Sequence, residues 1–251
     1  MHEYTKDTIE KLLENGVDTR DENGKTALML AAWIGDAKLV TSILAMGADV
    51  NLEDRLGSNV LQFASKQKNI EVLNFIAHSG VDLDKKERDG YQQSAIFTPA
   101  KVGNIPVLTF LLDAGANPDI TDKFKMTALQ WAAQEGKTES IKLLLKYGAE
   151  VNTRNNKGIT PLISACLIAG IAENVKLLLD GGANINEQSK KGDTAIYYAA
   201  YYGHPQIVQL LLEHGADHAL ENKRGEDAGK IAEKNKKEEV MAVIANWKNK
   251  K

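Results

Sequence analysis

The stretch Ile43-Leu44-Ala45-Met46-Gly47-Ala48-Asp49-Val50-Asn51 decides the fold, because close variants of it return along the chain. The variants cover Leu111–Asp119, Leu144–Asn152, Leu178–Asn186 and Leu211–Ala219. Glycine recurs with them at positions 47, 80, 115, 148, 182 and 215, so the spacings by subtraction are 33, 35, 33, 34 and 33 residues. A fixed period of this size predicts a solenoid, in which each unit buries its apolar face only against its neighbours.

One unit, residues 21–51, predicts two short helices joined by tight turns. Gly24 follows three polar residues, a pattern typical of a turn that needs positive φ. Thr26 stands where a helix N-cap belongs, since its hydroxyl can accept a hydrogen bond from a free backbone N–H. Gly35 ends this first helix, and a second helix over Ala37–Met46 carries apolar residues at helical spacing. Each unit is therefore a turn, a short helix, a tight loop, a longer helix and a further loop.

These residues resemble the ankyrin repeat, whose pattern opens with Asp-x-x-Gly-x-Thr-Pro-Leu and closes with Leu-Leu-x-x-Gly-Ala-x-x-Asn. Thr160-Pro161-Leu162 and Thr194-Ala195-Ile196 open two further units, and Ala132-Ala133-Gln134-Glu135-Gly136 matches the end of a first helix. The resemblance covers nearly the whole chain. It implies an all-α solenoid of stacked helix–turn–helix units with projecting β-turn or hairpin loops, and a protein–protein interaction scaffold as the function.

The 251 residues hold six complete units by this count, and we expect a single ankyrin-repeat domain over residues 1–251. The full repeats span residues 21–53, 54–86, 87–121, 122–154, 155–188 and 189–221. Residues 1–20 form an N-terminal half-repeat cap, and residues 222–251 form a C-terminal cap and tail with helical stretches over Ala228–Asn235 and Glu238–Trp247. Because the stretch Thr8–Asp18 resembles the second helix and loop of a repeat with no first helix before it, either a half-repeat caps the stack or residues upstream of Met1 are missing.

The third, fourth and fifth units depart from the pattern. The third carries two extra residues within 90–94 and places Pro99 inside its first helix, where proline bends or shortens a helix. The fourth has Lys125 where other units have the turn glycine, and the fifth has one extra residue within 167–170. Insertions in a solenoid map to loops on one face, often the binding face. Two interpretations stay open for them: function shaped these loops, or they drifted in a tolerant place.

In the ankyrin-repeat family the projecting turns and the first helices line a concave groove, so the resemblance places a partner there. The candidate partner-binding residues are those near the turn glycine or just before the inter-helix glycine: Trp33, Ile34, Arg55, Tyr91, Lys101, Phe124, Met126, Gln134, Glu135, Ile159, Leu167, Ile168, Tyr201 and Tyr202. Ten of them are apolar or aromatic at positions expected to face solvent, and exposed aromatic residues are typical of contact hot spots. The alternative is that Trp33, Leu167 and Ile168 pack locally against neighbouring turns.

Three aromatic residues of the first helices are expected to have structural roles. Trp131 and Tyr198 each stand before an Ala-Ala pair, a position that repeats as large and apolar and predicts core packing. Tyr197 stands one residue earlier, where its hydroxyl can bond to the neighbouring turn.

The sequence contains no motif for catalysis, a metal or a cofactor, so we expect none of the three. Cys166, the only cysteine, occupies a small-residue site of a packed helix, where a thiol behaves as a small hydrophobe. His214 and His218 are four residues apart, but Gly215-Ala216 breaks the helix between them and excludes a helical metal pair. A net charge of -3, with only five Arg among 31 basic residues, disfavours nucleic acid.

A non-catalytic interaction scaffold is the leading interpretation, with another protein as partner, no membrane insertion and a monomeric state. No apolar run approaches the ~20 residues of a membrane helix. With one cysteine and no visible signal peptide, we expect a cytoplasmic location. Two alternatives remain: a regulatory or targeting segment of a larger enzyme or effector, and a binder of small molecules or nucleic acid through Lys123, Lys157, Lys190, Lys191 and Lys223.

Overall fold

The computed structural model describes residues 4–67, 69–167 and 170–249, and within these ranges the chain is all α. Fifteen helices lie there, and the only strand-like pairing is an isolated bridge between Arg20 and Thr26. The helices are α1 Lys6–Leu13, α2 Ala27–Ile34, α3 Ala37–Ala45, α4 Val60–Lys66, α5 Ile70–Ala77, α6 Phe97–Val102, α7 Ile105–Asp113, α8 Ala128–Gln134, α9 Thr138–Lys146, α10 Pro161–Ala165, α11 Ala172–Asp180, α12 Ala195–Tyr202, α13 Pro205–Glu213, α14 Ala228–Lys234 and α15 Glu238–Lys248. The predicted all-α solenoid of helix–turn–helix units is confirmed. No helix in the described ranges is long and apolar enough to span a bilayer.

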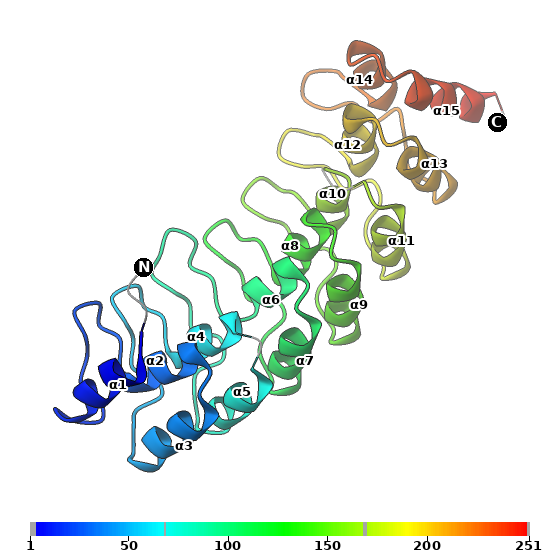
Figure 1. Cartoon of the computed structure of the whole chain (residues 1–251). Helices are drawn as coiled ribbons and strands as arrows, with labels where there is room; N and C mark the ends of the chain where they lie inside the picture. The colour runs from blue at the N-terminus through cyan, green and yellow to red at the C-terminus, as the bar shows by residue number, and fades with distance from the viewer. Residues whose placement is uncertain (1–3, 68, 168–169, 250–251) are drawn as a thin grey trace. The chain divides into compact units, whose positions relative to one another are not determined.

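The helices form two layers within each of two compact units (Figure 1). One unit comprises Met1–Ala100 and Asn104–Lys123, and the other comprises Lys101–Gly103 and Phe124–Lys251. In the first unit α2 packs against α3 and α4, and in the second unit α8 packs against α9 and α10. A first helix thus contacts the second helix of its own repeat and the first helix of the next. Within each unit the turns project beside the first helices, on the side away from the second helices (Figure 1). One domain over residues 1–251 stays a prediction.

Threonine side chains cap four of the first helices, as the sequence predicts at Thr26. The hydroxyl of Thr26 accepts a backbone N–H of α2 at 3.3 Å. Thr127, Thr160 and Thr194 cap the first helices of three later repeats in the same way. Gly35 ends α2 in the left-handed conformation, with φ of 76°. These caps satisfy backbone groups at the ends of helices that are too short to be stable alone.

The asparagine of the recurring phrase connects one repeat to the next. The side chain of Asn51 accepts a hydrogen bond from the backbone N–H of Asp82 at 2.8 Å, 31 residues further along the chain. Asn152 accepts from the backbone N–H of Asn184 in the same way, also at 2.8 Å. Each bond satisfies a loop N–H that lies outside any helix. Where the phrase ends in asparagine, its last residue therefore fixes the position of the following loop.

Successive turns are joined by backbone hydrogen bonds. In the second unit Lys190 N donates to Lys157 O and Lys223 N donates to Lys191 O, both at 2.9 Å. Such a bond requires the two turns to be in contact, and a Cβ at Gly158 would lie only 2.8 Å from Lys190 N. Glycine therefore has two functions at this place: it adopts a φ of 72°, and it leaves room for the next turn.

Departures from the repeat pattern have local consequences. Lys125, in place of the turn glycine, adopts a φ of 58°, which costs a residue with a Cβ roughly 1–2 kcal/mol. Helix α6 contains Pro99 and has six residues, against eight in α2 and five in α10, so an effect of Pro99 on its length stays a prediction. Gln92, within the insertion of the third repeat, also adopts a positive φ, of 55°. Of the insertion in the fifth repeat, residues 168–169 lie outside the described ranges.

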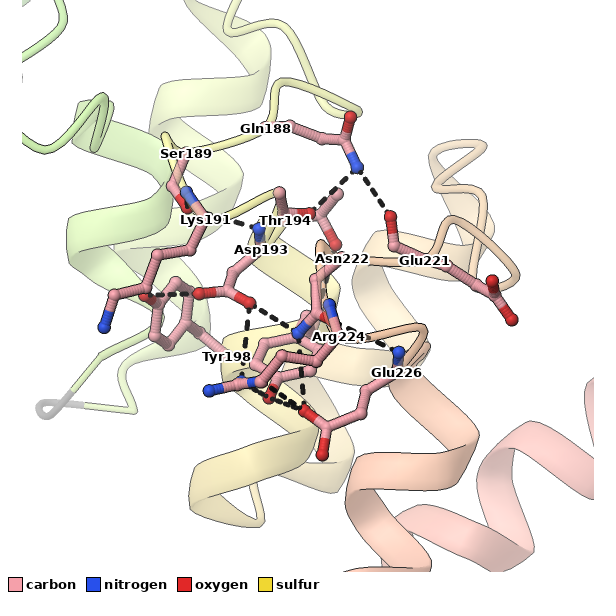
Figure 2. A network of polar contacts seen from close by, with 12 residues as sticks. Gln188, Ser189, Lys191, Asp193, Thr194, Tyr198, Glu221, Asn222, Arg224 and Glu226 are labelled. Carbon is pink, nitrogen blue, oxygen red and sulfur yellow. Dashed lines mark hydrogen bonds and ion pairs between the residues drawn. The ribbon is translucent and has the colours of Figure 1, made fainter.

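A polar network joins the last two turns of the second unit (Figure 2). Asp193 exposes only 2% of its surface, and its carboxylate accepts hydrogen bonds from Asn222 Nδ2 at 2.7 Å and from the Tyr198 hydroxyl at 3.1 Å. The guanidinium of Arg224 lies 3.8 Å from the same carboxylate. A buried carboxylate needs partners of this kind, because removing an unpaired charge from water is very costly.

Glu226 is the second anion of this network. Its carboxylate accepts from the Tyr197 hydroxyl at 3.1 Å, from Arg224 Nε at 2.8 Å and from Lys234 Nζ at 2.6 Å. The predicted bond from Tyr197 to the neighbouring turn is thus confirmed. The hydrogen bond from Lys234, supported by the charge of Arg224, holds the pKa of Glu226 at about 2. Burial and the bond to Glu226 raise the pKa of Tyr197 to about 12.

We expect Asn222→Ala to lower the free energy of unfolding of the last repeats by about 2 kcal/mol, because the buried Asp193 carboxylate loses a donor. The variant also removes the acceptor of two turn N–H groups. Chemical denaturation followed by circular dichroism measures the change. Asn155→Ala is the matched control, because Asn155 accepts two turn N–H groups but bonds no carboxylate among the described residues. Its expected loss is about 1 kcal/mol; equal losses would show that Asp193 does not depend on Asn222.

Acid should weaken the same network. The pKa of Glu226 in the folded chain is about 2, below the ordinary value of 4.5. Its contribution to stability is therefore complete above about pH 4.5 and is lost as the pH falls toward about 2. We expect the melting temperature to fall between about pH 4.5 and about pH 2, and to fall less in Glu226→Gln, which has no carboxylate to protonate. The same drop in both proteins would contradict a stabilising role for the Glu226 carboxylate.

Candidate functional site

Four predicted partner-binding residues lie exposed in the first unit. Trp33 and Ile34 end α2, while Arg55 and Tyr91 lie on projecting turns. The Trp33 ring also packs edge to face against Phe63, with ring centroids 6.3 Å apart. The ring therefore packs locally, as the alternative predicts, and still exposes 40% of the residue surface, so partner contact by Trp33 stays a prediction.

In the second unit, Tyr201 and Tyr202 end α12, and each exposes 41% of its surface. Their rings pack edge to face with centroids 5.0 Å apart, and Tyr202 stacks on His204 at 6.3 Å. Phe124, on the turn of the fourth repeat, and Glu135, at the end of α8, are also exposed. The two tyrosines form an aromatic platform whose rings are positioned by their neighbours.

Five predicted residues meet in one pocket of the second unit, about 270 Å³ in volume. The pocket lies between the turns of the fourth and fifth repeats and the ends of α8 and α10. Its lining residues are Phe124, Met126, Gln134, Asn155, Asn156, Lys157, Ile159 and Leu167. Four apolar side chains, three amides and one ammonium therefore surround a space suited to an apolar side chain on a polar backbone.

Two of these residues are more buried than the sequence predicts. The expectation that Met126 and Ile159 face solvent is wrong, because each exposes only 7% of its surface. Both immediately precede the threonine that caps the following helix. Ile159 N donates to the Asn155 side chain at 3.0 Å, and Ile159 O accepts from Gln130 Nε2 at 2.6 Å. Held between its own turn and the preceding repeat, this position is covered and lines the pocket from within.

Other expectations also need correction. Leu167 is half-buried rather than exposed, and Ile168 lies outside the described residues. Lys101 is half-buried, with its ammonium 4.4 Å from the centroid of the Trp131 ring in a cation–π contact. Trp131 and Tyr198 are half-buried rather than fully inside the core. Their partners are polar: the lysine lies over Trp131, and the Tyr198 hydroxyl bonds Asp193.

Three further residues line the pocket: Asn155, Asn156 and Lys157. The sequence analysis named Lys157 only for the alternative binder of small molecules or nucleic acid, and it missed Asn155 because it took positions repeat by repeat, whereas the pocket forms between two successive turns. The available signal was the polar turn before Ile159, which follows directly after the repeat that carries Phe124 and Met126.

Cys166, the only cysteine of the chain, does not lie in an environment that activates a thiol. The Cys166 thiol is fully buried, and burial raises its pKa, so the thiol stays protonated and unreactive near neutral pH. Burial and the nearby charge of Lys237 lower the pKa of His204, which favours the neutral imidazole. Over the described ranges, no three His, Cys, Asp or Glu side chains are grouped to hold a metal ion. The geometry offers a contact surface and a small pocket.

Known proteins are similar in sequence to part of this chain. Neurogenic locus notch homolog protein 1 of Xenopus tropicalis is 32% identical over 148 residues, which cover 58% of this chain and 6% of that protein. The Homo sapiens protein of the same name is 30% identical over 148 residues, with the same coverage. Palmitoyltransferase AKR1 of Lachancea kluyveri is 27% identical over 163 residues, which cover 62% of this chain and 22% of that protein.

The chain therefore spans a small part of the length of these relatives. A family model described as ankyrin repeats (3 copies) matches residues 1–87, 96–189 and 167–250. These three matches take in most of the chain, including every turn and helix of the pocket described above. The chain belongs to the ankyrin-repeat family.

Proposed function

We propose that this chain is a non-catalytic protein–protein interaction scaffold whose turns and first-helix ends bind a partner protein. The observation that carries the proposal is the exposure of large apolar side chains at the ends of first helices. Trp33 and Ile34 occupy this position in the first unit, and Tyr201 and Tyr202 occupy it in the second. Such side chains are typical of contact hot spots, because a partner that covers them removes apolar surface from water.

The proposed contact residues are those predicted positions that remain accessible. In the first unit they are Trp33, Ile34, Arg55 and Tyr91, and in the second unit Lys101, Phe124, Gln134, Glu135, Leu167, Tyr201 and Tyr202. Met126 and Ile159 contribute from inside the pocket. The buried, protonated Cys166 supports a non-catalytic role, since it leaves the chain without a cysteine nucleophile. We place the interaction in the cytoplasm, with the chain acting as a monomer.

The relatives favour a second candidate function. Matches that cover 6% of the notch homologues and 22% of the palmitoyltransferase indicate that repeats of this kind occur inside much longer proteins, one of them named as an enzyme. Regulation or targeting of an enzyme or effector is therefore our second proposal. An enzyme among the captured partners, with turnover that changes on binding, would favour it over a purely structural scaffold.

Double replacement of Tyr201 and Tyr202 by Ala should abolish partner capture while the melting curve changes little, because both rings are exposed. Two hot-spot tyrosines together contribute roughly 3 kcal/mol, on the order of a hundredfold in affinity. Affinity capture from the native lysate, read by mass spectrometry, compares this variant with the wild-type chain.

Met241→Ala is the control for this experiment. Met241 is also a large exposed apolar residue of the second unit, but it lies on the second helix α15, so the variant should retain the partner. Equal capture by the wild type and the tyrosine variant would remove the tyrosines from the proposed surface. A large fall in melting temperature would show instead that the tyrosine rings serve stability.

A further inference from the structure

Lysines project from four successive turns of the second unit. These lysines, all exposed, are Lys125, Lys157, Lys190, Lys191 and Lys223. Within the described part of the chain, none of their ammonium groups is paired with a carboxylate. Unpaired ammonium groups at the tips of turns are free to bind an anionic partner.

The carboxylates of the same turns are mostly paired already. Glu187 pairs with Arg154, and Glu221 pairs with Lys230. The two acids of the polar network described above are bound by tyrosine, asparagine, arginine and lysine side chains. Glu135 is an exposed acid, but it lies at the end of α8 rather than on a turn. Although the net charge of the whole chain is -3, the turns of the second unit therefore present uncompensated positive charge.

The apolar pocket and this positive charge belong to one surface, because Lys157 lines the pocket. Phe124 and Leu167 are accessible pocket residues, whereas Met126 and Ile159 are buried beneath them. The volume of about 270 Å³ lies at the small end of the range for binding sites, so the pocket has room for one large apolar side chain of a partner.

The lysines recur at the interval of the repeat. Lys157, Lys190 and Lys223 are 33 residues apart by subtraction, one on each of three successive turns. Because these turns are joined by backbone hydrogen bonds, a ligand that runs along them meets one positive charge per turn. An extended peptide with several carboxylates has the charge that complements such a row.

We infer that the second unit binds an extended acidic segment of its partner protein. One apolar side chain of the segment enters the pocket, and carboxylates of the segment pair with the turn lysines. This inference rests on the proposed scaffold function and deepens it by specifying the chemistry of the partner. Nucleic acid is the competing occupant, because its phosphates would also pair with the lysines.

Selection of a random dodecapeptide library displayed on phage, with the full chain immobilised, tests the inference without knowledge of the partner. We expect the enriched peptides to carry several Asp or Glu residues and one large apolar residue. The best peptide, labelled with fluorescein, is then titrated by fluorescence anisotropy against the wild type and variants. A labelled single-stranded oligonucleotide of mixed sequence is the probe for nucleic acid.

Variants at two exposed positions distinguish the contribution of the lysine charge from that of the apolar pocket. Lys157→Glu should weaken peptide binding about tenfold, because attraction becomes repulsion. Phe124→Ala should also weaken it about tenfold, because the pocket loses a wall. Lys38→Glu on α3 is the matched control, since it changes the net charge equally and replaces an exposed lysine that lies on a second helix. A peptide with Ala in place of its apolar residue should bind the wild type about tenfold more weakly, but should lose little further affinity for Phe124→Ala.

Circular dichroism confirms that each variant is folded before it is titrated. Enriched peptides that are neutral or basic, or a selection that enriches none, would overturn the inference. So would equal affinities of Lys157→Glu and Lys38→Glu, or tighter binding of the oligonucleotide than of the best peptide. The scaffold function survives any of these outcomes if the wild-type chain still captures a protein that the Tyr201/Tyr202 variant loses.

Discussion

The contact between the backbones of successive turns is the constraint on which the rest of this structure depends. Helices of five to eleven residues are marginal by themselves, so each is stable only when neighbours cover its apolar face. The bond from Lys190 N to Lys157 O brings two turns into contact, and the absence of a Cβ at Gly158 makes that distance possible. Stability in such an array comes from neighbouring pairs of repeats. The last two turns are joined in addition by side chains, because the Asp193 carboxylate accepts from Asn222 and from the Tyr198 hydroxyl.

Most of the fold could be predicted from the sequence, because each structural device recurs in one repeat after another. Thr26 caps its helix as predicted, and the final two helices were expected to within one residue of their observed ends. The exposure of Met126 and Ile159 could not be predicted in the same way. Their burial depends on contact between repeats, such as the bond from Gln130 to the Ile159 carbonyl, and a pattern taken one repeat at a time does not contain that contact.

The roles of the charged residues on the turns could not be predicted from the sequence either. Arg224 and Lys157 are both cations on projecting turns, and the sequence does not distinguish their roles. In the folded chain Arg224 is bound to Glu226 and to the Tyr197 hydroxyl, so it holds the last repeat in place. Lys157 has no such partner among the described residues and lines the pocket instead. The charge available to a ligand is therefore set by which turn carboxylates are already paired, and a net charge of -3 conceals it.

The turn of the fourth repeat combines a strained backbone, two residues of the pocket and an unpaired lysine. The other three turns of the second unit have glycine at Gly158, Gly192 and Gly225, all with positive φ, whereas this turn has Lys125 in the same conformation. A glycine there would relieve roughly 1–2 kcal/mol of backbone strain. The strained turn is also the one that supplies Phe124 and Met126 to the pocket, and its lysine adds a further unpaired ammonium. Backbone strain tends to persist where function requires a particular side chain. Its coincidence with the pocket favours the interpretation that binding, rather than drift in a tolerant loop, shaped the turn of this repeat.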